Sequence, residues 1–297
     1  VVLGNGGTTA FWEVAAFGLV REHARLASFG EFGAKFAKSI AAAPFLAEPS
    51  VVKAEPGTAG YLTAADGVDV YGTPQNETST GVSVPVRRVG DGLMLHDATS
   101  AAGGLDVDLT ETDVYYLAPQ KGLASDGGLW IAIMSPAALR RAGQIADSGR
   151  YIPEFLSLTT AIDNSRKEQT YNTPALATIF LAAEQVDAMN AAGGLAAMTK
   201  RCADSAARLY DWADNSTIAE PFVTDPAIRS NVVGTIDFVA EVDAAAIAQV
   251  LRANGILDTE PYRKLGRNQL RIAMYPAIDP EDISALTACI DYVAQHL

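Results

Sequence analysis

Residues 115–128 read Tyr-Tyr-Leu-Ala-Pro-Gln-Lys-Gly-Leu-Ala-Ser-Asp-Gly-Gly, so an apolar strand runs into Lys121 and a glycine-rich turn follows. An amine at the edge of a buried sheet is partly desolvated, which disfavours its charged form. A neutral amine can form a Schiff base with an aldehyde. Because most lysines are solvated surface cations, Lys121 is a candidate catalytic residue only together with other features of the chain.

The pattern around this stretch alternates short apolar segments with helical segments. Strands are predicted at residues 1–3, 51–52, 68–71, 93–96, 114–117 and 129–134, whereas residues 21–26 are predicted to be helical. The alternation predicts an α/β fold with a mostly parallel sheet that is covered on both faces. Ligands of such sheets bind beyond the carboxyl ends of the strands. The turn at residues 4–9, Asp97 and Lys121 all follow predicted strands.

The pattern changes after residue 215. A strand is predicted at 231–239, a helix from a cap at Asp243 to residues 254–255, a strand at 269–275 and a last helix after a cap at Asp279. This order describes a compact α+β unit. We predict a large domain at residues 1–196 and a small C-terminal α+β domain at residues 197–297.

Composition excludes several classes of protein. The 297 residues carry a net charge of −13 and no long run of lysine and arginine, which argues against a nucleic-acid-binding protein. No apolar run is long enough to span a bilayer. The two cysteines lie far apart in helical patterns, so neither a disulfide framework nor a metal site is expected, and a cytoplasmic location is predicted. The chain begins at Val1 as if inside a strand, so we expect that a natural first segment is missing.

The turn Gly4-Asn5-Gly6-Gly7-Thr8-Thr9 opens a helix directly after a strand. Glycines let the backbone approach a phosphate, and free N–H groups at a helix start bind anions. The turn is not a Walker loop, because no lysine follows it. It also lacks the GxGxxG spacing of a dinucleotide site. Such a site needs an acidic residue on a second strand, and residues 21–26, where that strand would lie, are predicted to be helical. A plain tight turn remains an alternative.

Asp97 ends the predicted strand Leu93-Met94-Leu95-His96-Asp97. Strand alternation places Leu93 and Asp97 on one side and His96 on the other. A carboxylate at a buried strand end needs a cationic partner, and a protonated pyridine nitrogen fits this need. A turn or helix-cap aspartate is the alternative. Asp97 precedes Lys121 by 121 − 97 = 24 residues, enough for one crossover between neighbouring strands.

Four cations stand within the nine residues from 263 to 271, with no acid among them: Arg263, Lys264, Arg267 and Arg271. Arginine suits bidentate capture of carboxylate and phosphate. The chain as a whole is strongly acidic, so this local positive charge fits a binding site for a small substrate that carries several negative charges. A solvated surface is the alternative.

Several motifs in this order resemble the phosphoserine aminotransferases, especially the actinobacterial form, over the whole chain. They are Gly6-Gly7-Thr8-Thr9-Ala10-Phe11-Trp12, Asn76-Glu77-Thr78, Asp97, Ala118-Pro119-Gln120-Lys121, Tyr171-Asn172-Thr173-Pro174 and the basic stretch from Arg263 to Arg271. The resemblance implies the type I fold of pyridoxal-phosphate enzymes and a homodimer with sites at the subunit interface. It implies transamination between glutamate and 2-oxoglutarate on one side and 3-phosphohydroxypyruvate and O-phosphoserine on the other, in serine biosynthesis.

The resemblance also implies roles for individual residues. Lys121 would hold the cofactor and move the proton, Asp97 would pair with its pyridine nitrogen, and Phe32 would stack on its ring, although Phe32 also has the helical spacing of a core residue. Thr78 would lie near the ring substituents. The remaining residues implied to bind cofactor or substrate are Gly7, Thr8, Thr9 and Gln120 at the cofactor phosphate, Asn172 and Thr173 at the phosphate of the other subunit's cofactor, and Arg263 and Arg271 at the substrate.

The chain departs from the family pattern in two places. Many relatives have an arginine in the phosphate loop where this chain has Thr9. We also expect that the family's first segment, with a substrate-binding His-Arg pair, is missing. The cofactor-binding set is therefore expected to be complete and the substrate-binding set incomplete. Alternatives are another class V pyridoxal-phosphate enzyme (a small amino-acid aminotransferase or a desulfurase-like enzyme), a truncated cofactor-binding protein without turnover, and a dinucleotide-binding module.

Overall fold

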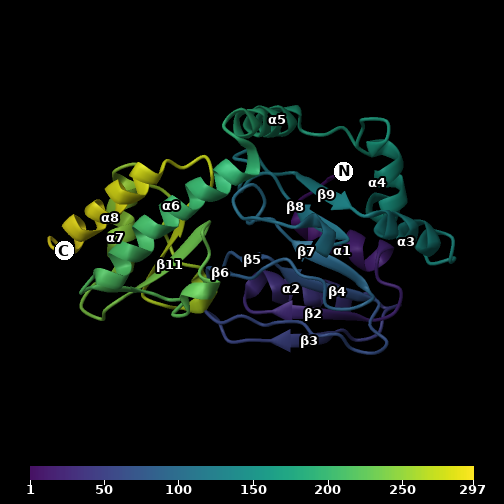
Figure 1. Cartoon of the computed structure of the whole chain (residues 1–297), viewed down its shortest axis with the longest axis horizontal. Coiled ribbons are helices and arrows are strands. Elements are labelled where there is room, and N and C mark those ends of the chain that lie inside the picture. Colours follow the sequence, from purple (N-terminus) through teal and green to yellow (C-terminus); the bar gives the residue numbers. More distant parts are fainter.

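The computed structural model describes all 297 residues, and a seven-stranded sheet forms the centre of its larger part (Figure 1). The strand order is β1-β9-β8-β7-β4-β2-β3, and all neighbours pair in parallel except β9, which is antiparallel to both β1 and β8. The predicted mostly parallel sheet is therefore confirmed. Its strands are β1 (Val2–Asn5), β2 (Ala24–Ser28), β3 (Ser50–Lys53), β4 (Val70–Pro74), β7 (Leu93–Asp97), β8 (Val114–Leu117) and β9 (Leu129–Met134).

Helices pack on one face of this sheet and enclose the largest core. Phe11 and Trp12 of α1 and Phe36 of α2 are buried there against sheet residues such as Leu95 and Tyr116. The helices of this part are α1 (Thr8–Gly18), α2 (Glu31–Ala41), α3 (Pro136–Ala146) and α4 (Leu158–Ser165). The spacing of apolar residues that predicted α2 is explained by this core, because Phe36 and Ile40 both point into it.

The other face of the sheet is covered differently. Tyr71 and Met94 pack there against Val82 and Val223, and Leu117 packs against Cys202. The covering elements are the hairpin of β5 (Asn76–Glu77) and β6 (Val82–Ser83) and the C-terminal third of the chain. A hairpin and the smaller part of the molecule thus take the place of a second helical layer.

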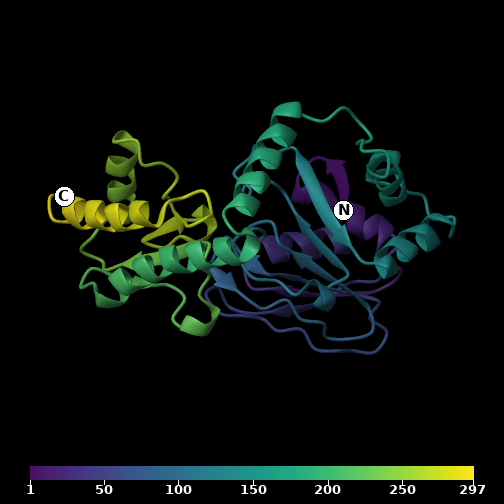
Figure 2. The ribbon, with the colours of Figure 1, turned by 45° about the horizontal axis from the view of Figure 1, so that its top comes forward.

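The C-terminal part is built on a three-stranded antiparallel sheet in the order β10-β11-β12. Asp243 and Asp279 cap α7 and α8 as predicted, each accepting hydrogen bonds from backbone N–H groups of the first turn. The long helix α6 connects the two parts (Figure 2). The elements are α6 (Gly194–Asn215), β10 (Ala219–Pro221), β11 (Val233–Phe238), α7 (Ala244–Ala253), β12 (Gln269–Ala273) and α8 (Pro280–Ala294). Because α6 runs across residues 196 and 197, the domain boundary placed there stays a prediction.

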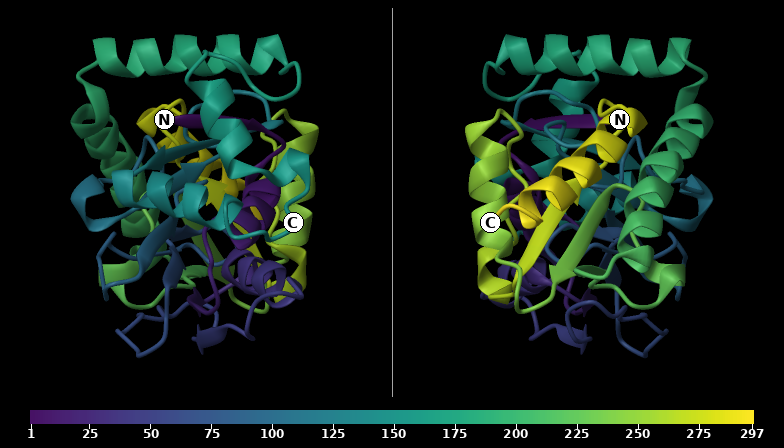
Figure 3. Two further views of the ribbon diagram at one scale, coloured as in Figure 1. Left: turned by 90° about the vertical axis from the view of Figure 1, so that its right-hand side faces the viewer. Right: turned by 90° about the vertical axis from the view of Figure 1, so that its left-hand side faces the viewer.

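One helix has few intramolecular contacts. α5 (Leu176–Ala191) lies along the outer edge of the molecule (Figures 1 and 3), and only Thr178 and Met189 are buried. Leu176 is 74% exposed and Phe180 is 62% exposed. None of the helices is long and apolar enough to cross a membrane.

The helix predicted at residues 21–26 is wrong, because this segment is a turn followed by β2. The Asp69 carboxylate accepts hydrogen bonds from the backbone N–H groups of Arg21, Glu22 and His23 at 2.8–2.9 Å. These three N–H groups therefore bond a distant carboxylate, whereas in a helix backbone N–H groups bond carbonyl groups of the same helix. Asp69 lies 46 to 48 residues away in the chain, so no local pattern indicates its role.

The sheet order also contradicts a dinucleotide-binding module. In that fold, the glycine-rich turn joins two neighbouring parallel strands. Here β1 is an edge strand, and β9, β8, β7 and β4 separate it from β2. The glycine turn after β1 therefore serves another site.

Candidate active site

A cavity of about 260 Å³ lies at the carboxyl ends of β7 and β8. Its walls come from α1, α2, β5 and the segments that follow the two strands. Seven of the side chains predicted from the sequence line it: Thr8, Thr9, Phe32, Thr78, Asp97, Gln120 and Lys121. Segments as far apart in the chain as residues 8 and 121 thus meet at one edge of the sheet.

Asp97 is buried and has no cationic partner. Its carboxylate accepts hydrogen bonds from the Trp12 indole Nε1 at 3.2 Å and from the Thr99 backbone N–H at 2.9 Å. Burial raises the pKa of Asp97 above its ordinary value, although these bonds oppose the shift. A buried carboxylate that meets only neutral donors is stabilised by a positive charge brought into the cavity.

Lys121 follows β8, whose four residues are all buried. Burial lowers the pKa of the Lys121 amine, and the positive charge of Arg271 lowers it further. The turn after Lys121 packs tightly, because a Cβ atom on Gly122 would lie 2.0 Å from the Ala102 carbonyl oxygen. The sheet and this contact together fix the lysine at the cavity.

The start of α1 forms one end of the cavity. Gly7 is the N-cap residue and provides no side-chain cap, so the first N–H groups of the helix have no acceptor within it. A Cβ atom on Gly7 would meet nothing within 4 Å. Thr8 Oγ1 bonds Thr99 Oγ1 at 2.7 Å. A helix start with free N–H groups and adjacent hydroxyls is suited to a phosphate.

β5 supplies a second polar wall. Asn76 Nδ2 and Thr78 Oγ1 both donate to Ser100 Oγ at 2.8 Å. The buried Asn76 Oδ1 has no hydrogen-bond partner within the chain. With Asp97, the lysine and the anion-binding helix start, this unpaired acceptor fits a phosphorylated, nitrogen-containing ring with polar substituents. The residues present therefore fit pyridoxal phosphate.

A wider hollow of about 810 Å³ opens beside the cavity, and Lys121 borders both. Two of the cations that line it are already in ion pairs. Arg252 binds Asp258 and Glu260, both at 2.7 Å, and Lys264 binds Glu31.

Acids that are distant in the chain pair with part of the basic stretch. Arg267 binds Asp237, and Lys264 binds Glu31. Arg263 and Arg271 take part in no ion pair, and both line the wide hollow. Arg271 lies over the Tyr262 ring, with 5.8 Å between the guanidinium carbon and the ring centroid. The two predicted substrate ligands are thus the cations of this stretch that remain free for an anion.

Asn172 and Thr173 do not line the cavity of their own chain. The Asn5 side chain bonds the backbone N–H and C=O of Asn172, both at 3.1 Å. These bonds fix the Asn172 backbone and leave both side chains exposed. Their predicted role at the other subunit's cofactor is compatible with this placement and stays a prediction.

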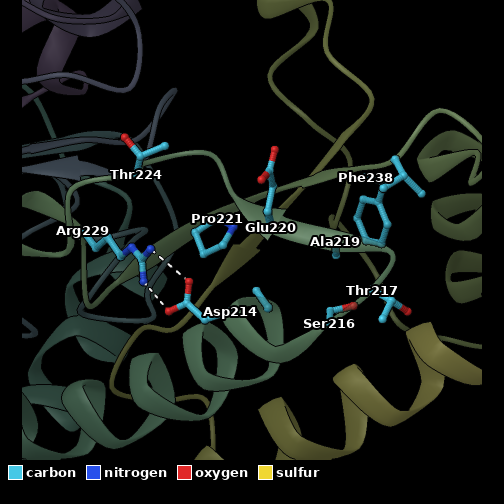
Figure 4. Close-up of a pocket in the computed structure, with 11 residues that line it drawn as sticks. Asp214, Ser216, Thr217, Ala219, Glu220, Pro221, Thr224, Arg229 and Phe238 are labelled. Atoms are coloured by element: carbon cyan, nitrogen blue, oxygen red, sulfur yellow. Dashed lines mark hydrogen bonds and ion pairs between the residues drawn. The ribbon is translucent and has the colours of Figure 1, made fainter.

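Another hollow, of about 470 Å³, lies on the small sheet beside β10 (Figure 4). Arg229 and Asp214 form a two-pronged ion pair there, with bonds of 2.7 and 3.1 Å. Because Arg229 is the only cation that lines this hollow and it is already paired, the hollow offers no free cation of the kind found at Arg263 and Arg271. No group of three or more His, Cys, Asp or Glu residues in the chain could hold a metal ion.

Sequence reasoning assigned no role to four residues that line the cavity: Trp12, Asn76, Thr99 and Ser100. Thr99 and Ser100 directly follow Asp97, so their place just past a strand end was a usable signal. Asn76 and Thr78 stand two apart, which puts both on one side of a strand. Trp12 lies one helical turn after Thr8 and Thr9, on the same face of α1.

Solved structures define the class of protein. The chain superposes on a phosphoserine aminotransferase from Cytophaga hutchinsonii with a TM-score of 0.90 and 21% identity, covering 98% of this chain and 82% of that one. A phosphoserine aminotransferase from Trichomonas vaginalis with bound pyridoxal phosphate gives a TM-score of 0.83 and 16% identity over 98% and 81%. At these identities the comparison shows the fold, which is that of the pyridoxal-phosphate-dependent aminotransferases.

Known sequences define the family, although no family model matches the chain. A phosphoserine aminotransferase from Nocardioides sp. is 62% identical over 302 residues, and a putative one from Mycobacterium sp. (strain KMS) is 60% identical over 300 residues. Each match covers the whole chain and 81% of the relative. The chain belongs to the phosphoserine aminotransferase family, and it is an aminotransferase that depends on pyridoxal phosphate.

Proposed function

We propose that Lys121 holds pyridoxal phosphate as a Schiff base and that Asp97 pairs with the nitrogen of its ring. The observation that carries this proposal is the pairing of a desolvated amine and an uncompensated buried carboxylate around one cavity. Asp97 ends β7, and Lys121 follows the neighbouring parallel strand β8. Each group lacks the partner that the cofactor would supply.

The other cavity residues have complementary roles in this proposal. Phe32 lies against the ring, and Thr78 lies near its substituents. Gly7, Thr8, Thr9 and Gln120 hold the phosphate, since Gly7 is the N-cap of α1 and the other three line the cavity at this helix start.

The proposed chemistry follows from these positions. When bound, pyridoxal phosphate supplies a conjugated ring that accepts the electron pair left by loss of a substrate Cα proton. Lys121 Nζ, whose pKa is lowered by burial and by the charge of Arg271, would take this proton and return it on the cofactor side. Asp97 keeps a proton on the ring nitrogen, and this positive charge favours electron withdrawal.

We propose that glutamate and 2-oxoglutarate exchange an amino group with 3-phosphohydroxypyruvate and O-phosphoserine. Arg263 and Arg271 support this proposal, because they are unpaired cations beside Lys121 and suit a carboxylate and a phosphate. The reaction belongs to serine biosynthesis. A cytoplasmic location agrees with two free cysteines, one of them buried.

We further propose a homodimer. α5 is mostly apolar and exposes Leu176 and Phe180, and a second copy of the chain would cover them. Asn172 and Thr173 lie just before α5 and would then reach the partner's cofactor phosphate. Phe180→Asp should shift the protein toward monomer in analytical ultracentrifugation and weaken cofactor retention. A Phe180→Asp protein that stays dimeric would remove α5 from the interface.

Reduction with borohydride tests the cofactor assignment. Treating the loaded protein with borohydride should add the mass of a reduced pyridoxyl phosphate to the tryptic peptide that contains Lys121. Lys121→Ala should lose both this label and the visible absorbance band. Lys264→Ala, which removes another lysine bordering the wide hollow, is the matched control and should keep both. Labelling that persists in Lys121→Ala would contradict the assignment.

A further inference from the structure

Glu77, in the middle of the Asn76-Glu77-Thr78 segment, is fully buried and forms no ion pair. Its carboxylate accepts four different donors. The backbone N–H groups of Phe32 and Gly33 donate to Oε2 at 3.1 and 3.0 Å, and the Ser79 hydroxyl and backbone N–H donate to Oε1 at 2.6 and 3.3 Å. Every neighbour that it bonds is a donor, so the arrangement suits an ionised carboxylate.

These bonds end on the first turn of α2, which has no cap of its own. The N-cap residue Gly30 provides no side-chain hydrogen bond. Ser79 Oγ accepts from the Glu31 backbone N–H at 3.0 Å, so Glu77 and Ser79 satisfy three of the N–H groups that a helix start leaves free. A Cβ atom on Gly30 would lie 2.3 Å from Glu77 Cγ, so glycine at this position allows the close approach.

The residue that Glu77 holds by its backbone also lines the cofactor cavity. Phe32 lines the wall of the cavity, and so do Asn76 and Thr78, the two chain neighbours of Glu77. Asn76 and Glu77 are successive residues of β5, so their side chains point to opposite sides of the strand, and Thr78 in the turn that follows lines the cavity again. One short segment thus borders the cavity directly and also anchors the helix that carries the aromatic ring.

We infer that Glu77 is a positioning residue, which fixes the ring of Phe32 against the cofactor by capping α2 from outside the helix. The inference rests on the cofactor placement proposed above. A negative charge at a helix start is also favoured by the helix dipole. Burial raises the pKa of Glu77, and the bonds from Ser79, Gly33 and Phe32 oppose that rise. Glutamine, of the same shape, would turn an NH₂ group toward N–H donors.

Hydrogen exchange in the cofactor-free protein tests the cap. Glu77→Gln should speed exchange of the Phe32 and Gly33 amides by about ten- to a hundredfold, the range expected for loss of a charge-assisted bond. Glu111→Gln is the matched control, since Glu111 Oε2 also accepts a backbone N–H, that of Arg88 at 2.8 Å, and does not line the cavity. It should leave the exchange of both α2 amides unchanged.

A second variant keeps the test decisive if Glu77→Gln fails to fold. Glu77→Asp retains the charge but shortens the side chain by one methylene group, so the same two amides should exchange at an intermediate rate. Wild-type protection of Phe32 and Gly33 in whichever variant folds would overturn the inference.

Cofactor binding tests the link to Phe32. The dissociation constant of pyridoxal phosphate and the visible circular dichroism of the bound cofactor are measured for Glu77→Gln, Phe32→Leu and the double variant. Glu77→Gln should weaken binding and alter the dichroism, yet change little when Phe32 is already leucine. Equal effects in both backgrounds, or faster exchange with unchanged cofactor signals, would overturn the positioning role. Absence of the Lys121 label in wild type would instead contradict the proposed function, and the exchange result would still stand.

Discussion

The inner cavity and the wide hollow meet at Lys121, yet they are built by opposite means. The cavity is walled by the ends of sheet strands and by side chains that bond one another, such as Asp97 with Trp12 and Thr99. The hollow is lined mainly by charged side chains of the C-terminal part, including the exposed Arg263. A permanently held cofactor needs a fixed, desolvated site, whereas substrates that enter and leave need charges that water can reach.

This contrast predicts that changes in the cavity affect the chemical step most. Asp97→Asn keeps the shape but supplies no negative charge, so the half-reaction with glutamate should slow by about a thousandfold or more, as expected for loss of strong electrostatic stabilisation. Stopped-flow absorbance measures this rate. The cofactor should remain bound, because Lys121 and the phosphate site are intact. A half-reaction rate within tenfold of wild type, with the cofactor bound, would show that the cavity does not need this charge.

Changes in the hollow should affect substrate selection more than chemistry. Arg263→Ala and Arg271→Ala should each reduce kcat/KM for O-phosphoserine by about ten- to a hundredfold, corresponding to roughly 1.5–3 kcal/mol for a charge-assisted hydrogen bond. Whichever arginine faces the phosphate should lose less activity with serine and alanine than with O-phosphoserine. Arg267→Ala is the matched control, because Arg267 is already bound to Asp237 and does not line the hollow. If both variants keep the wild-type preference for O-phosphoserine, the hollow does not select phosphate.

The smallest expected effect lies where the two regions meet. Arg271 lowers the pKa of Lys121, after burial, so Arg271→Gln should raise that pKa toward its ordinary value. The pH at which the cofactor-free protein captures pyridoxal phosphate at half its maximal rate should therefore move upward. Arg252→Gln serves as the control, since Arg252 borders the hollow but is paired with Asp258 and Glu260. No shift in Arg271→Gln would mean that Arg271 does not contribute to the lowered pKa, and a downward shift would contradict its assigned effect.

Sequence reasoning succeeded where local patterns determine the structure. The bounds of β8 and β9 agree with the predicted 114–117 and 129–134, because apolar runs that end in proline or glycine mark a buried strand directly. The caps at Asp243 and Asp279 were equally visible, since a cap acts within four residues.

Sequence reasoning was wrong or incomplete where a residue far away in the chain determines the local structure. The strand β2 depends on Asp69, and the cap of α2 depends on Glu77, both more than 40 residues away. The basic stretch showed four equivalent cations, and only the fold reveals that Asp237 and Glu31 pair with two of them. The resemblance to a family identified most of the cavity residues, but the bonds that hold those residues in place could not be seen in the sequence.

Trp12 gives the molecule a built-in optical probe. It is one of three tryptophans, and it lines the cavity with its indole bonded to Asp97. Trp130 instead packs at a tilted angle against Phe11 in the core, and Trp212 bonds Asp291 in the C-terminal part. We expect the fluorescence of Trp12 to be quenched when a conjugated ring enters beside it. Loading of the site can therefore be followed by emission alone, without an added dye.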